Sequence, residues 1–137
     1  MILEVEAGGA LVDTDFLIDL NRGKGSKWRQ KAEKLLYDIN YENLFVSNIT
    51  VTEFITGIPR DKREEVQNML RQLYYYIAPT YDEAFLAGTL RQEWRSKGYS
   101  ISIADVTNAA IAISRKLVLV TRNTKHYPFE QLLIKSW

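Results

Sequence analysis

The sequence contains no cysteine and only one histidine, His126, among its 137 residues. The absence of cysteine excludes disulfide bonds, thiolate zinc sites and a cysteine nucleophile. A metal site in this chain would therefore be built from oxygen ligands. Clustered carboxylates without thiolate or imidazole favour Mg²⁺ or Mn²⁺ over zinc.

Strong net charge and long apolar segments are also missing. The formal net charge of +1 at pH 7 produces no field that would attract nucleic acid by itself, so local basic patches would have to do so. No apolar run is long enough to span a membrane as a helix. The first nine residues carry two glutamates where a secretory signal would carry basic residues. We therefore expect a cytoplasmic protein without membrane contact.

The length and the 46% of hydrophobic residues suit a single domain over residues 1–137. Residues 1–9 precede the first predicted strand and form an N-terminal extension to which we assign no role. The first strand is not followed by a Gly-x-Gly-x-x-Gly or Walker loop, and this disfavours a nucleotide-binding Rossmann module.

Short apolar runs alternate with segments of helical spacing along the chain. The apolar runs predict strands at residues 10–12, 44–46, 75–78 and 117–120, with a short fifth strand at 132–134. The helical spacing predicts helices at 14–20, 28–39, 48–55, 61–74, 81–97 and from 102 or 103 through 112. In the helix at 28–39, we expect Trp28 on the apolar face. This alternation predicts a three-layer α/β/α fold with a central parallel sheet of four to five strands flanked by helices.

Three acidic residues stand at the edges of these apolar segments. Asp13 directly follows the first predicted strand, and Glu53 and Asp105 lie early in helices that we expect to pack against the same edge of the sheet. The apolar residues Phe54 and Ile55 beside Glu53 suggest that this acid lies in a buried turn. Ligands of parallel α/β sheets bind at the carboxyl ends of the strands. Crowded carboxylates repel one another and take up protons unless a cation neutralises them. The pattern therefore predicts a divalent metal site.

Four segments in this order resemble the motifs of the PIN domain family, and in size and motif order the chain resembles the toxin ribonucleases of VapBC toxin–antitoxin pairs. The segments are LVDTDFLI at 11–18, TVTEF at 50–54, IADVTNAAIA at 103–112 and LVTRN at 119–123. The resemblance extends from about residue 10 to residue 134. It implies that Asp13, Glu53 and Asp105 are the metal-binding acids.

The resemblance also implies what the protein does. It implies an endoribonuclease that uses Mg²⁺ or Mn²⁺ and hydrolyses RNA phosphodiester bonds with a metal-activated water. It further implies a homodimer and a VapB-like antitoxin as partner protein. The alternative is a weakly active or inactive PIN domain that mainly binds another protein.

The fourth motif departs from the family, whose members often carry an aspartate at its last position. This chain has Asn123 there, and His126 stands before Tyr127 at the other place where the family puts an aspartate. An asparagine carbonyl can ligate a metal but adds no charge. We therefore expect Asn123 to complete the metal shell as a weaker ligand.

Other polar residues near these motifs have two interpretations each. Arg122, Lys125 and Asn108 are candidate substrate contacts, while the alternative for the basic residues is an ordinary solvated face. We expect Asp15 to cap the first helix or support the ligands rather than bind the metal itself. We expect Asp19 to be a solvated helix residue and His126 to be a surface side chain rather than a general base.

Three consecutive tyrosines occupy positions 74–76. They would serve as a base-stacking platform for single-stranded RNA, as a protein interface, or as a strand with aromatic side chains on both faces. The third interpretation fits the predicted strand at 75–78 best.

Overall fold

A computed structural model of the chain describes residues 9–39 and 43–137. Except for Gly9, the predicted N-terminal extension lies outside the described residues. Five parallel strands form one sheet in the order β3-β2-β1-β4-β5. The strands are β1 (Ala10–Val12), β2 (Leu44–Ser47), β3 (Tyr75–Ile77), β4 (Val118–Val120) and β5 (Ile134–Lys135). The parallel sheet is confirmed, and its fifth strand begins two residues later than predicted.

In the described part of the chain, six α-helices lie in pairs between the first four strands. They are α1 (Thr14–Leu20), α2 (Lys27–Ile39), α3 (Asn48–Thr56), α4 (Arg63–Leu73), α5 (Tyr81–Ser96) and α6 (Ile103–Arg115). Two short 3₁₀ segments, η2 (Arg60–Lys62) and η3 (Thr124–His126), precede α4 and follow β4. The predicted helices are confirmed, with boundaries that differ by no more than a few residues.

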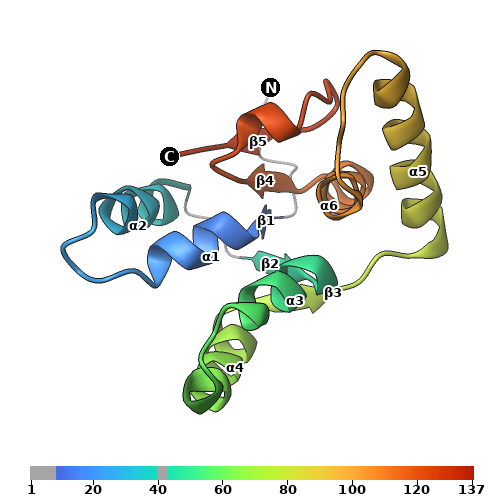
Figure 1. Cartoon of the computed structure of the whole chain (residues 1–137). Coiled ribbons are helices and arrows are strands. Elements are labelled where there is room, and N and C mark those ends of the chain that lie inside the picture. The colour runs from blue at the N-terminus through green and yellow to red at the C-terminus, as the bar shows by residue number, and fades with distance from the viewer. Residues whose placement is uncertain (1–8, 40–42) are drawn as a thin grey trace.

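The sheet separates two hydrophobic cores, as its alternating side chains require. Leu11 and Leu119 pack with apolar residues of α5 and α6, whereas Val12 and Val120 pack with Phe16 and its neighbours on the other side. Figure 1 shows the strands between α5 and α6 on one side and α1 and α2 on the other. This arrangement is the predicted α/β/α sandwich.

A close backbone approach precedes the central strand. Gly9 has a φ of +141°, and a Cβ atom at this position would lie 2.3 Å from the carbonyl oxygen of Asn43. The next residue, Ala10, donates its N–H to the same oxygen over 3.0 Å. Only glycine combines this φ with this contact, so Gly9 sets the entry of β1 beside the segment that leads into β2.

An ion pair between the buried Glu83 and the partly exposed Arg115 joins two of the helices. Thr80 and Glu83 form a reciprocal capping box at the start of α5. Arg115, at the end of α6, donates from Nε and Nη2 to the two oxygens of Glu83, each over 2.8 Å. These hydrogen bonds from Arg115 lower the pKa of Glu83 to about 2. The start of α5 is thereby fixed to the end of α6, the helix that carries Asp105.

Two local predictions on α1 and α2 are corrected by the structure. The residue that caps α1 is Asp13, which accepts from the backbone N–H of Thr14, and not Asp15, which lies inside the first turn. Trp28 was expected on the apolar face of α2 but is 40% exposed, because its ring packs under the Arg122 guanidinium instead of entering the core. Within residues 9–39 and 43–137, no helix is long and apolar enough to cross a membrane.

Candidate active site

Asp13 occupies the centre of the carboxyl edge of the sheet, directly after β1. Its backbone N–H donates to the carbonyl of Val120 at the end of β4, over 2.9 Å. Its carboxylate is only 7% exposed and accepts from Thr14 N–H over 2.8 Å at Oδ1. At Oδ2 the hydroxyls of Thr121 and Tyr127 lie 3.1 and 2.7 Å away. These three donors satisfy the buried Asp13 carboxylate and fix its position.

The Tyr127 hydroxyl connects Asp13 to a second acid. It lies 3.1 Å from Oδ1 of Asp105, so one phenol touches both carboxylates. Burial, followed by the charges of Asp13 and Asp105, raises the pKa of Tyr127, and the phenol therefore stays protonated and acts as a donor. We did not single out Tyr127 from the sequence as a site residue, although it directly follows His126 at the variable end of the fourth motif.

Glu53 is connected to the same group through Thr14. The Thr14 hydroxyl donates to Oε1 of Glu53 over 2.7 Å, while the Thr14 N–H donates to Asp13. Glu53 itself is exposed and not in the buried turn that its apolar neighbours led us to expect, although Phe54 is buried and Ile55 packs against the same core. The three predicted acids are thus linked by two residues, Thr14 and Tyr127, at one edge of the sheet.

Asp15 lies beside Asp13 and is 9% exposed. Its Oδ2 accepts from the Arg122 N–H over 2.9 Å and from the Asn123 amide over 3.2 Å, and the Thr121 hydroxyl lies 3.3 Å away. Its Oδ1 is buried and has no hydrogen-bond partner among the described residues. Burial and then the charge of Asp13 raise the pKa of Asp15 to about 6.

Asn123 and His126, at the two positions where the family often has an aspartate, contact Asp15 and Asp105. Asn123 is exposed, and its side-chain amide donates to Asp15. Nδ1 of His126 lies 3.2 Å from Oδ2 of Asp105, and the His126 side chain is 57% exposed. His126 is therefore a surface residue at the rim of the acidic group, in agreement with its position next to Lys125.

Asp19 is fully buried, so the expectation that it is a solvated helix residue was wrong. Arg22 Nε and Trp137 Nε1 donate to its two oxygens over 2.7 and 2.9 Å. Arg122 Nε lies 3.6 Å from Oδ2 of Asp19. The partners Arg122 and Trp137 follow more than one hundred residues later in the chain, which is why the local pattern of α1 did not predict them.

The three residues predicted to contact substrate have different positions. Lys125 is exposed in η3. The Arg122 guanidinium stacks 4.1 Å from the Trp28 ring centre and is partly exposed. Asn108 is 1% exposed and bonds Ser47 and Thr50 of the β2–α3 junction. This burial does not favour a substrate contact for Asn108. Its hydrogen bonds instead connect α6 to the start of α3.

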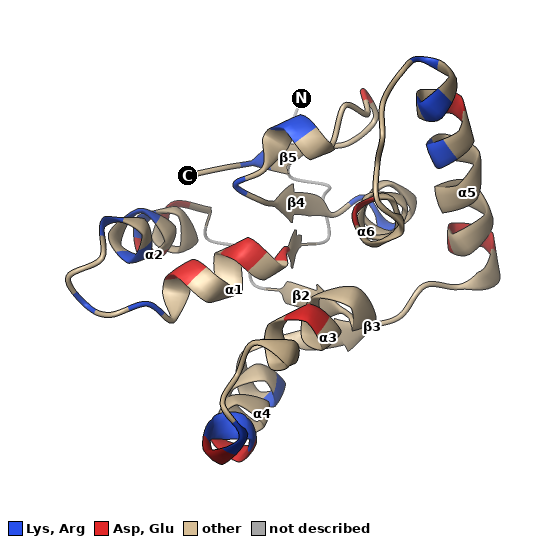
Figure 2. Cartoon of the chain, in the orientation of Figure 1, with Lys and Arg blue, Asp and Glu red and all other residues tan. Residues whose placement is uncertain are grey.

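The donor chemistry of this edge suits a hard divalent cation. All of the acids that meet here offer oxygen, and the unpartnered Oδ1 of Asp15 is an acceptor that a cation or its water would satisfy. Figure 2 shows acidic stretches on α1, α3 and α6. Over the described ranges, however, no three acidic or histidine side chains converge closely enough to ligate one ion as they stand. Glu53 and Asp105 are accessible to solvent, so their side chains can adjust to an ion.

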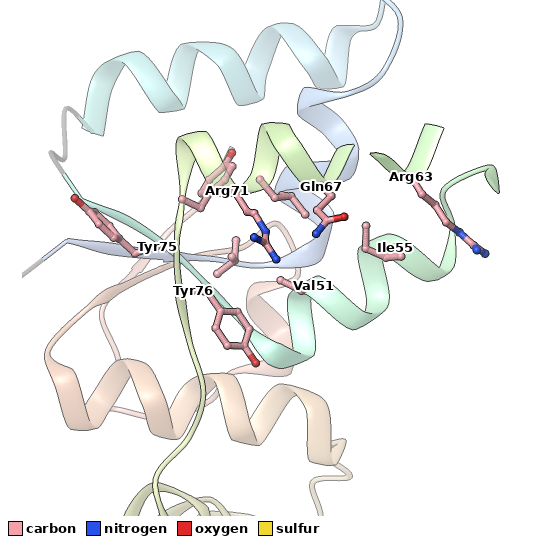
Figure 3. Close-up of a pocket in the computed structure, with 10 residues that line it drawn as sticks. Val51, Ile55, Arg63, Gln67, Arg71, Tyr75 and Tyr76 are labelled. Carbon is pink, nitrogen blue, oxygen red and sulfur yellow. The ribbon is translucent and has the colours of Figure 1, made fainter. Parts of the chain in front are cut away.

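A separate cavity of about 740 Å³ lies between α3, α4 and β3 (Figure 3). Apolar side chains of Val46, Val51, Ile55 and Leu70 line it together with Arg63, Gln67, Arg71 and Tyr74–Tyr76. Tyr74 is buried, whereas Tyr75 and Tyr76 are each 60% exposed. The predicted strand is present, but both tyrosines within β3 are exposed, and the buried Tyr74 precedes the strand at the end of α4. The expectation of aromatic side chains on both the inner and the outer face of this strand was therefore wrong.

The fold and the site define the class of this protein. It is a Rossmann-like domain in which a parallel sheet lies between helices, and carboxylates linked by hydroxyl groups stand at the carboxyl edge of the sheet as candidate oxygen ligands. The family model of the PIN domain matches residues 10–131. The chain therefore belongs to the PIN domain family.

Curated relatives and solved structures agree with this assignment. The chain is 30% identical over 125 residues to Ribonuclease VapC1 of Methanocaldococcus jannaschii, covering 91% of this chain and 83% of that protein. It is 28% identical over 126 residues to Ribonuclease VapC of Rickettsia bellii, covering 87% and 88% of the two chains. A toxin–antitoxin complex from Klebsiella pneumoniae contains a chain with a TM-score of 0.72 and 29% identity, covering 90% of this chain and 95% of that one.

Proposed function

We propose that this protein is an endoribonuclease toxin that hydrolyses RNA phosphodiester bonds with the help of Mg²⁺ or Mn²⁺. The observation that carries the proposal is the linkage of Asp13, Glu53 and Asp105 by Thr14 and Tyr127 at the carboxyl edge of the sheet. The similarity to relatives named as VapC ribonucleases supports the same activity.

Each acid has a distinct task in this proposal. Asp13 is the fixed ligand, because its backbone is tied to β4 and its carboxylate is buried. Asp105 and Glu53 are the adjustable ligands, and Asn123 contacts Asp15, which shares the Thr121 hydroxyl with Asp13. The bound cation would activate a water and stabilise the negative charge that develops on the phosphate.

The residues around the acids hold and orient them. Thr121 and Tyr127 direct their hydroxyls at Asp13, so the position of its carboxylate is set before any ligand arrives. Lys125 projects from η3 on the rim beside His126, where a phosphate backbone would approach. We propose Lys125 and the partly exposed Arg122 as contacts to that backbone.

The decisive experiment compares RNA cleavage with and without a divalent cation. The purified chain should cleave RNA in Mn²⁺ or Mg²⁺ and stop in EDTA, and Asp13→Asn and Asp105→Asn should each remove the activity. Asp61→Asn, the same change at an exposed position of η2, is the matched control and should cleave normally. Cleavage that survives in EDTA or in Asp105→Asn would reject the proposed metal-dependent site.

The alternative, a weakly active domain that mainly binds another protein, is tested by the same assay. If the chain binds its partner tightly but releases no RNA fragments in any divalent cation, the alternative is correct. Trace cleavage that is equal in the wild-type chain and in Asp105→Asn would lead to the same conclusion, because it would come from a contaminating nuclease.

We also propose that the partner is a small VapB-like antitoxin and that the toxin itself is a homodimer in the cytoplasm. The structural neighbour from Klebsiella pneumoniae comes from a toxin–antitoxin complex. In this chain, the cavity between α3, α4 and β3 combines an apolar lining with Arg63 and Arg71, which suits a segment with apolar and acidic side chains.

Co-purification with a small protein encoded next to the gene tests the antitoxin. Tyr76→Asp, which places a negative charge at the exposed rim of the cavity, should weaken the complex. Tyr81→Asp makes the same change at the exposed first residue of α5 and should leave it intact. Equal recovery of both complexes would place the partner elsewhere on the toxin.

A further inference from the structure

The asparagine that stands at the family's fourth acidic position contacts another acid of this chain. Asn123 stands where the family often has an aspartate, and its amide Nδ2 lies 3.2 Å from Oδ2 of Asp15. Asp15 comes from the first turn of α1, two residues after Asp13. The residue without charge and the residue with charge are therefore in direct contact at the site.

The two oxygens of Asp15 have different surroundings. Oδ2 is surrounded by donors from the segment after β4: the N–H of Arg122, the amide of Asn123 and the hydroxyl of Thr121. Oδ1 has no partner among the described residues, although it is buried in a side chain that is 91% shielded from solvent. A buried acceptor without a donor is costly, so an unpartnered oxygen of this kind commonly has a functional ligand.

Asp15 also shares a neighbour with the central acid. The Thr121 hydroxyl lies 3.1 Å from Oδ2 of Asp13 and 3.3 Å from Oδ2 of Asp15, and with its single proton it donates to only one of them at a time. The two carboxylates thus lie close to each other and share one donor, and Oδ1 of Asp15 is left without a partner among the described residues. A nearby cation would remove this deficit.

We propose that Asp15 supplies the fourth negative charge of the cation site through Oδ1, and that Asn123 holds the Asp15 carboxylate in place. The charge that the family often carries at the end of the fourth motif is carried in this chain by α1 instead. This inference rests on the proposed metal-dependent function and concerns only which residues provide its ligands.

Mn²⁺ binding tests whether Asp15 supplies the charge in place of position 123, and this measurement does not depend on activity. Free Mn²⁺ is measured by electron paramagnetic resonance during titration of the full chain at neutral pH. Asp15→Asn should weaken Mn²⁺ binding at least tenfold, and the double variant Asp15→Asn/Asn123→Asp should recover most of that loss, because it moves the charge back to position 123. The surface control Asp61→Asn should bind like the wild-type chain.

Thermal unfolding in EDTA separates this role from a purely structural one. If Asp15 acts through the cation, Asp15→Asn should leave the melting temperature in EDTA unchanged or raise it, because a buried charge is removed, and should reduce the increase that Mn²⁺ produces. A structural role instead predicts a lower melting temperature in EDTA and an unchanged increase with Mn²⁺. That result would overturn the proposal.

The failure of this inference is distinguishable from failure of the proposed function. If the wild-type chain binds Mn²⁺ and Asp13→Asn abolishes binding while Asp15→Asn stays within twofold of wild type, the site exists but Asp15 does not contribute its charge. If the double variant binds as poorly as Asp15→Asn, the exchange with position 123 is wrong. If the wild-type chain binds no Mn²⁺, the metal-dependent function and this inference are both rejected.

Discussion

The phenol of Tyr127 lies 2.7 Å from the carboxylate of Asp13, and the two residues are 114 positions apart in the sequence. The same hydroxyl also touches Asp105. A single neutral donor therefore offsets part of the repulsion between two acids, and both acids depend on the segment that follows β4.

Tyr127→Phe removes this donor while keeping a buried aromatic ring. We expect the free energy of unfolding without divalent cation to fall by about 2 kcal/mol, since Asp13 loses a charge-assisted hydrogen bond. Added Mn²⁺ should restore part of the loss, because the cation also offsets the repulsion. Urea unfolding with and without Mn²⁺ measures both effects. Tyr37→Phe, at an 85% exposed position, is the control and should change the free energy of unfolding by no more than about 0.5 kcal/mol. An equal effect of both variants would contradict the role of Tyr127 as a donor to Asp13.

Asp19→Asn tests the buried cluster at the other end of α1. The fully buried Asp19 carboxylate accepts from Arg22 and Trp137. Removing its charge should lower the free energy of unfolding by about 2–3 kcal/mol. This is less than the cost of breaking a fully buried ion pair, because Arg22 is partly exposed. Asp38→Asn breaks an exposed pair with Lys34 and should cost less than about 1 kcal/mol. Denaturant midpoints compare the two variants, and a loss no larger than that of Asp38→Asn would show that the cluster does not stabilise the fold.

Acid unfolding should depend on Glu83. Its pKa is lowered to about 2 from an ordinary value of 4.5 by Arg115, so the ionised form contributes stability that is complete above pH 4.5 and is lost as the pH falls toward 2. The shift corresponds to about 3 kcal/mol. Glu83→Gln should be less stable at pH 7 but should lose less stability between pH 4.5 and 2. Parallel pH profiles of the two proteins would contradict this interpretation of the Glu83–Arg115 pair.

Lys125→Ala tests the proposed phosphate contact. We expect RNA binding to weaken by roughly three- to tenfold, and the slope of log affinity against log salt to decrease by about 0.7, as for one lost contact to single-stranded RNA. Binding is measured with a fluorescent RNA in Ca²⁺ or EDTA to prevent cleavage. Lys62→Ala, an exposed lysine on η2, is the control. If the two variants bind alike, Lys125 does not contact the substrate.

The sequence was sufficient for the elements of the fold because the signals for them are local. The apolar run before Asp13 and the alternation of strands with helices predicted the parallel sheet and placed Asp13 at its carboxyl edge. The identity of the strand neighbours was not predicted, because the order β3-β2-β1-β4-β5 is set by contacts between distant segments.

The site was predictable only where a residue's role follows from its own motif. The partners of Asp13 and Asp19 lie near the end of the chain, so neither the Tyr127 bridge nor the burial of Asp19 is visible in α1 alone. Glu53 shows the reverse error. Its apolar neighbour Phe54 is buried, but one helical step of about 100° turns Glu53 to the surface.

The position of β4 beside β1 determines when the site can form during synthesis of the chain. Thr121 and Tyr127, the two hydroxyls that orient Asp13, follow β4 and leave the ribosome only after most of the chain. A growing or truncated chain that ends before residue 121 has Asp13, Glu53 and Asp105 but neither hydroxyl to arrange them. The arrangement of the three acids is therefore completed only after most of the chain has been synthesised.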